Sequence, residues 1–152
     1  MRRMTVYSVF TFALGAIVFF YSSPVMAQSG ASLAQVMKKA NAGYAEAQYN
    51  LALAYEEGRG VKKNHGLAVR WYRRAAMQGL VQAQFNLGKM YKNGKGVARN
   101  YVEAYKWLSL ATRGDVVPSA RLLRDELKFR LTREERLEAE EWVLHWKPVP
   151  ER

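Results

Sequence analysis

Few residues in this chain could carry out chemistry. The 152 residues include two histidines and no cysteine, so a cysteine nucleophile is excluded. The His-Glu-x-x-His and Gly-x-Ser-x-Gly motifs do not occur. No serine after residue 27 has lysine three positions later, as a Ser-x-x-Lys nucleophile requires; these serines are Ser29, Ser32, Ser109 and Ser119. The sequence therefore predicts no catalytic residue, no cofactor and no enzyme.

The histidines and acidic residues do not suggest a metal site. His65 lies in the first turn of an expected helix, and His145 ends the last one, where a positive charge suits the helix dipole. A glutamate-rich run near the C-terminus is acidic enough to suggest calcium. Its acids are spread around a helix among arginines, which is typical of a solvated face with i,i+4 pairs. The run contains Glu134, Glu135, Glu138, Glu140 and Glu141. We predict surface roles for these residues and no metal.

Two further patterns could bind phosphate or nucleic acid. Gly-x-Gly-Val occurs at 58–61 and 94–97, but each copy follows an expected helix and lacks a preceding strand, so we do not expect a phosphate loop. Arginines flank aromatic residues at 70–74, as they do in single-strand binders. Because the helix stack needs these aromatic residues, the arginines remain as outer charges and nucleic acid is not an expected partner.

An internal repeat of 36 residues defines the elements that would position a site. Residues 40–75 align without a gap on residues 76–111, and 14 of the 36 positions are identical. A period of this length is typical of stacked-repeat proteins, whose units bury their apolar faces against one another. The sequence therefore predicts an all-α solenoid with one binding surface.

Each repeat reads as two helices joined by a glycine turn. Leu51 and Tyr55 fall on one stripe of the first helix, and the glycines at 58–61 can take the left-handed conformation that ends it. Asn64 is expected to cap the second helix, and Trp71 to be buried between helices. The equivalents in the second repeat are Leu87, Tyr91, Asn100 and Trp107.

The flanks are expected to cap the stack. A possible capping box at 32–35 would open a short helix that ends near residue 40. After residue 111 the repeat decays, and a second capping box at 132–135 opens the expected last helix. The predicted organisation is a signal peptide at 1–27, an N-terminal capping helix at 28–39, repeats at 40–75 and 76–111, and a degenerate third repeat with a C-terminal cap at 112–152.

The first 27 residues are expected to be a secretory signal. Arg2 and Arg3 precede an apolar run at 9–20, and Ala27 follows a helix-breaking Ser-Ser-Pro, which is the order of a signal peptide. We predict cleavage near Ala27 and a periplasmic or secreted protein. The apolar run is shorter than the ~20 residues that span a bilayer, so an uncleaved inner-membrane signal anchor is the alternative. Without cysteine, no lipid anchor is expected. The sequence leaves the oligomeric state open.

One spaced pattern runs through both repeats. In the first copy it contains Gly43, Ala47, Gln48, Leu51, Tyr55, Gly58, Gly60, Val61, Ala68, Trp71 and Ala75. This pattern resembles the Sel-1-like repeat of exported bacterial proteins, which is related to the tetratricopeptide repeat. The resemblance implies a right-handed superhelix of α/α hairpins with atypical capping helices, and a role as adaptor or scaffold. Ala52 replaces the family's usual glycine, so we expect helices to cross slightly farther apart there.

The resemblance also implies where a partner would bind. In tetratricopeptide-like stacks the first helix of each hairpin lines the concave groove, so positions two before and two after Leu51 and Leu87 are expected to face it. The candidate partner-binding residues are Tyr49, Asn50, Leu53, Phe85, Asn86, Lys89, Lys92 and Arg121. The alternative is that the two asparagines bond across the hairpin and the aromatic pair completes the packing between repeats.

The charge of the chain favours an anionic partner. The formal net charge is +11, and without Arg2 and Arg3 the remaining 22 basic and 13 acidic residues give +9. We predict a non-catalytic adaptor whose protein partner is acidic or membrane-associated. The first alternative is a structural envelope protein that binds peptidoglycan or another anionic polymer. The second is a secreted hydrolase or β-lactam-binding protein.

Overall fold

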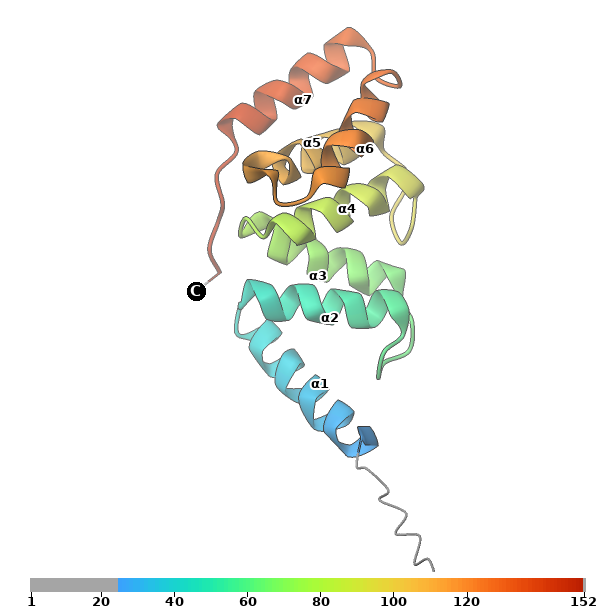
Figure 1. Cartoon of the computed structure of the whole chain (residues 1–152), viewed down its shortest axis with the longest axis vertical. Coiled ribbons are helices and arrows are strands. Elements are labelled where there is room, and N and C mark those ends of the chain that lie inside the picture. Colours follow the sequence, from blue (N-terminus) through green and yellow to red (C-terminus); the bar gives the residue numbers. More distant parts are fainter. Residues whose placement is uncertain (1–24, 152) are drawn as a thin grey trace, which may run out of the picture.

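The computed structural model of the chain describes residues 25–151, and the predicted signal segment up to residue 24 lies outside this part. Helices stack one above another from α1 to α7, and the described residues contain no strand (Figure 1). The elements are α1 (Val25–Asn41), α2 (Ala45–Glu57), α3 (His65–Met77), α4 (Val81–Asn93), α5 (Tyr101–Ala111), a 3-10 turn η1 (Arg113–Asp115), α6 (Pro118–Lys128) and α7 (Arg133–His145). The predicted all-α repeat fold is confirmed.

Each repeat forms a helical hairpin, α2 with α3 and α4 with α5 (Figure 1). Helix α2 ends at Gly58 with φ 81°, and α4 ends at Gly94 with φ 67°, the left-handed region that glycine enters at little cost. The Asn64 side chain accepts a bond of 3.0 Å from the Leu67 amide, and Asn100 caps α5 in the same way. Both Gly-x-Gly segments therefore end helices, as predicted.

Small residues let the hairpins approach each other closely. Ala68, Ala83 and Ala104 are fully buried, and Leu87 and Leu108 fill the space between them. Burial of such side chains is the main force that holds a stack of this kind together. The structure thus builds its core from the alanines and leucines of the repeated pattern.

The two repeated tryptophans differ in their surroundings. Trp107 is 4% exposed, and its ring lies 5.5 Å from the Trp142 ring of α7, edge to face. Trp71 is only partly buried, and the Arg74 guanidinium lies 4.8 Å from its ring centre. The prediction of burial is therefore confirmed for Trp107 and only partly for Trp71, which packs against the smaller cluster formed by Ala40, Ala47 and Leu51.

The two ends of the stack match the sequence to different degrees. Helix α1 begins at Val25, so Ser32 lies inside it and the predicted capping box at 32–35 is wrong. At the other end the capping box is present, since Thr132 and Glu135 exchange bonds of 2.9 and 3.2 Å. The Tyr105 hydroxyl of α5 donates to Glu140 of α7 and ties the last helix to the stack. Within residues 25–151 no helix combines the length and apolarity that a membrane span needs.

Candidate functional site

The predicted binding strip lies on α2, α4 and α6. Tyr49, Leu53 and Phe85 are partly buried and pack against the main core. On α2, Asn50 is exposed. On α4, the Lys89 ammonium lies 5.2 Å from the centre of the Phe85 ring. The aromatic residues of the strip therefore also serve the packing between repeats.

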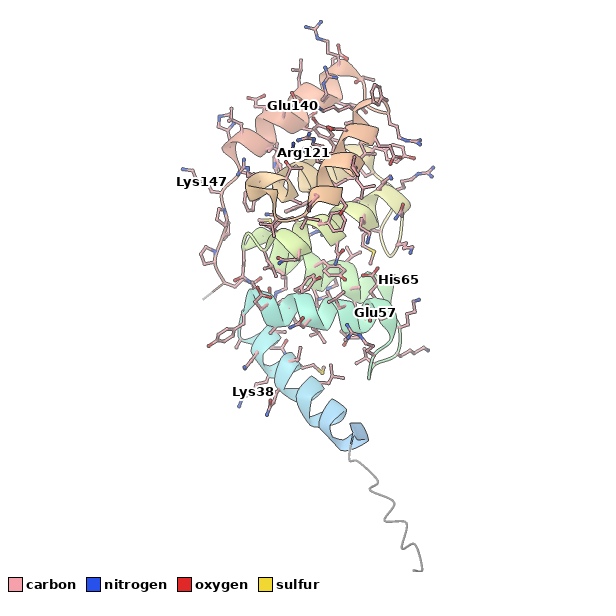
Figure 2. The ribbon with its side chains drawn as sticks, in the orientation of Figure 1. Lys38, Glu57, His65, Arg121, Glu140 and Lys147 are labelled. Carbon is pink, nitrogen blue, oxygen red and sulfur yellow. The ribbon has the colours of Figure 1, made fainter. Side chains whose placement is uncertain are left out.

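A hollow of about 480 Å³ opens between the two hairpins. We call it the α2–α4 hollow. It brings together three residues of the predicted strip, Leu53, Asn86 and Lys89, with charged residues that the sequence did not single out. Its lining consists of Leu53, Glu56, Glu57, Lys63, His65, Asn86, Lys89 and Lys95. Figure 2 labels Glu57 and His65 at this end of the hairpins.

Tyrosines pack next to the hollow. The Tyr72 hydroxyl donates a bond of 2.6 Å to the Glu56 carboxylate, and the Tyr72 ring lies 5.8 Å from the Tyr49 ring. Burial, reinforced by the bond to Glu56, raises the pKa of Tyr72 far above its usual range. Burial also raises the pKa of Tyr49. Both hydroxyls therefore stay protonated near neutral pH, and Tyr72 holds one hollow-lining carboxylate in place.

The lining carries both signs of charge. Glu56 and Glu57 oppose Lys63, Lys89 and Lys95. Nδ1 of His65, a further lining residue, is buried without a hydrogen-bond partner within the protein. A lining of this kind can bind polar and charged side chains of either sign beside the apolar Leu53.

Lys92 and Arg121 are placed differently from the rest of the strip. The Lys92 ammonium is 2.5 Å from the Glu126 carboxylate of α6 and is only 18% exposed, and this contact lowers the pKa of Glu126. Lys92 therefore joins α4 to α6 within the chain. Arg121 is exposed on α6, at another level of the stack from Glu57 and His65 (Figure 2). The structure does not gather these two residues at the hollow.

Apart from Lys89, the charged residues of the hollow lie outside the predicted binding strip. Glu56 and Glu57 fall one turn after Leu53. Lys63 lies in the loop that follows the first Gly-x-Gly segment, and Lys95 lies within the second one. The spacing from Leu53 was a usable signal for the glutamates. The sequence held no such signal for Lys63 and Lys95, because the position of these lysines depends on how each loop folds back. Among residues 25–151, no three His, Cys, Asp or Glu side chains are grouped as a metal site would need.

The fold and the repeated hairpins define an α/α repeat protein. The Sel1 repeat family model matches residues 45–80 and 81–116. The chain therefore contains two Sel1 repeats, as the resemblance in its sequence implies. The matched repeats keep the period of 36 residues and begin five positions after the repeats at 40–75 and 76–111.

Two repeat proteins are among the solved structures that are similar to this chain. One is a protective antigen present in uropathogenic Escherichia coli strains that displays an SLR fold, with 36% identity, a TM-score of 0.71 and 76% of this chain covered. The other is a Sel1 repeat protein from Oxalobacter formigenes, with 33% identity, a TM-score of 0.60 and 63% of this chain covered. The matches span 25% and 28% of those two proteins. No curated protein matches the chain.

Proposed function

We propose that this chain is an exported, non-catalytic adaptor that binds a protein partner at the α2–α4 hollow. Sel1-repeat proteins are generally scaffolds for protein–protein interaction. The observation that carries the proposal is the hollow itself, where Leu53, Asn86 and Lys89 of the predicted strip line a single concavity. An apolar side chain beside an amide and both signs of charge suits a folded or extended protein surface better than a uniformly anionic polymer.

Charge at the hollow favours an acidic segment of the partner. Three lysines and two glutamates line it, and one of the glutamates, Glu56, already accepts the Tyr72 hydroxyl bond. The lysines are thus the groups best placed to pair with acids of a partner. Such pairs contribute mainly to the rate and selectivity of association.

Export is part of the proposal and rests on the sequence. A cut after Ala27 would leave a chain that starts at Gln28, inside α1, so most of that helix would remain. Mass spectrometry of the periplasmic fraction tests this. A chain that begins at Gln28 supports export, and a membrane-bound product that still carries Met1 would instead support a signal anchor.

Reversal of the lysine charges tests the binding site. The variant Lys63→Glu, Lys89→Glu, Lys95→Glu changes three lining residues. A matched control, Lys38→Glu, Lys39→Glu, Lys62→Glu, makes the same charge change at exposed residues outside the lining. With the partner found by cross-linking to the wild-type chain, we expect the first variant to bind about tenfold more weakly or worse and the control to bind nearly normally. Equal binding by both would place the contact elsewhere.

A further inference from the structure

The C-terminal tail lies against the stack at the end of the hairpins opposite the α2–α4 hollow. After α7 the chain runs in an extended form beside the helices (Figure 1). The Val149 amide donates a bond of 2.9 Å to the Met77 carbonyl. Lys147, which Figure 2 labels on this side, and Pro148 to Pro150 are exposed. The tail is therefore held by few contacts.

Two equivalent glycines receive the tail. Gly43 and Gly79 are one repeat apart and have φ of 90° and 94°. A Cβ at Gly79 would lie 3.3 Å from Pro148, and one at Gly43 would lie 3.2 Å from Glu151. Three extended residues span about 10 Å, so the tail advances three residues for each repeat of the stack.

Glu151, the last residue that the structure describes, lies in a prepared carboxylate site. Its carboxylate accepts bonds of 3.1 Å from Nε and 2.6 Å from Nη2 of Arg74. It also accepts a bond of 2.7 Å from Nε2 of Gln48. Paired donors from one guanidinium are among the strongest and most directional contacts a carboxylate can make. This contact with Arg74 lowers the pKa of Glu151.

The groups around this carboxylate are fixed by the fold. Gln48 is fully buried, its Nε2 also donates to the Ala40 carbonyl, and its Oε1 accepts a bond of 2.8 Å from Gln78. Arg74 is stacked on the Trp71 ring. Such preorganised donors lower the entropy cost of holding an anion. We call Gly43, Gln48, Arg74, Gln78 and Gly79 together the turn site.

The side chains of the turn site differ from their equivalents one repeat later, and this difference indicates which ligand residue each repeat suits. Gln84 is the repeat-two equivalent of Gln48 and bonds the Ala76 carbonyl. The positions equivalent to Arg74 and Gln78 are Leu110 and Gly114, which offer no side-chain donor. The first repeat therefore suits an acid, and the second suits an apolar residue such as proline.

Beside the tail there is room that the tail does not fill. A hollow of about 600 Å³ is lined by Ala42, Tyr44, Gln78 and Pro150. A longer ligand along the same path would gain contacts there.

A second copy's tail would repeat the contacts of the chain's own tail and would compete with a tethered segment at millimolar effective concentration.

We propose that the turn site binds an extended segment of a partner protein in which a proline precedes a glutamate or aspartate by three residues. The chain's own tail holds this place until such a segment replaces it. The basic charge of the chain favours an acidic segment. The inference does not rest on the α2–α4 hollow.

The test uses a labelled peptide with the sequence of residues 145–152 added to the full-length chain. Glu151→Gln weakens the hold of the chain's own tail, so we expect this variant to bind the peptide about tenfold more tightly than the wild-type chain does. A peptide with glutamine in place of its glutamate is expected to bind about tenfold more weakly. Adding Arg74→Gln to the variant should abolish the gain, whereas Arg70→Gln, an exposed change on the same helix, should not.

Three results would overturn the proposal. They are failure of the Glu151→Gln chain to bind the peptide, equal binding of the glutamate and glutamine peptides, and a wild-type dimer that depends on Glu151. The last result would show that a second copy is the occupant. If Arg74→Gln fails to fold, the comparison of the two peptides still decides the outcome.

Discussion

Equivalent residues of the two repeats lie in different surroundings. Trp107 is covered by Trp142 of the last helix, whereas Trp71 is partly open and is faced by Arg74. The identical motif positions gave no sign of this difference, because it arises from what lies beyond the repeat. Position in the stack therefore decides how much each tryptophan contributes to stability.

We expect Trp107→Ala to lower the free energy of unfolding by about 3–5 kcal/mol, since it empties a large buried site. Trp71→Ala should cost clearly less, because part of its ring is already in contact with water. Urea denaturation of both variants measures the difference. Equal losses would show that Trp71 is buried as deeply as Trp107 in solution.

The Glu151 carboxylate makes tail docking dependent on pH. Its pKa lies below the ordinary value of 4.5, chiefly because of the bond from Arg74. A lowered pKa in the folded state means that the docked tail is fully stabilised above about 4.5 and loses this stabilisation as the pH falls through the lowered pKa.

We therefore expect the Val149 amide signal in an NMR titration to stay constant from neutral pH to about 4.5 and to shift as the tail leaves at lower pH. Glu151→Gln should remove this transition, since glutamine does not titrate. A wild-type signal that does not move under acid would mean that the carboxylate does not hold the tail.

At the level of helices, the repeats use different small residues to bring α2 and α4 close to their partners. Gly88 of α4 lies against Leu108, and a Cβ there would be 2.7 Å from the Leu108 Cγ atom. The equivalent of Gly88 in repeat one is Ala52, which is fully buried, and the equivalent of Leu108 is Tyr72. Repeat one thus places an alanine and a tyrosine in the same buried cluster where repeat two places a glycine against a leucine.

Gly88→Ala is expected to destabilise the chain by about 1–2 kcal/mol, because overpacking outweighs the gain of about 1 kcal/mol in helix propensity. Ala52→Gly should also destabilise the chain, by about 1 kcal/mol, since this change lowers helix propensity and removes packing contacts without a compensating gain. Thermal melts of both variants check these signs. A more stable Gly88→Ala chain would show that α4 and α5 can separate without cost.

The local parts of the structure were predictable, and the long-range parts were not. Helix stripes, glycine ends and asparagine caps follow from residues within one turn, and Gly58, Asn64 and Thr132 behave as their types indicate. The contact of Gln48 with Glu151 joins residues 103 positions apart, and no spacing rule reaches that far. The candidate strip was only partly gathered, because Lys92 pairs with Glu126 of α6 and Arg121 lies at another level of the stack.

Across the whole molecule, the two ends of the hairpins offer different surfaces. One end carries the α2–α4 hollow, with lysines and glutamates around Leu53. The other carries the turn site, where Arg74 and Gln48 hold a carboxylate. A solenoid can present both surfaces at once because each repeat contributes a residue to each end. This arrangement suits an adaptor that contacts more than one segment.

Site-specific photo-cross-linking tests the central claim most directly. A photoreactive amino acid replaces Lys89, which lines the hollow, or Arg70, which is exposed on α3 outside it, and the full-length chain is irradiated in living cells. The account predicts a discrete adduct with a protein from position 89 and none from position 70. Two results would contradict the claim that the α2–α4 hollow is the binding site. One is an adduct from position 70 alone. The other is the lack of an adduct from position 89 while the wild-type chain still captures its partner.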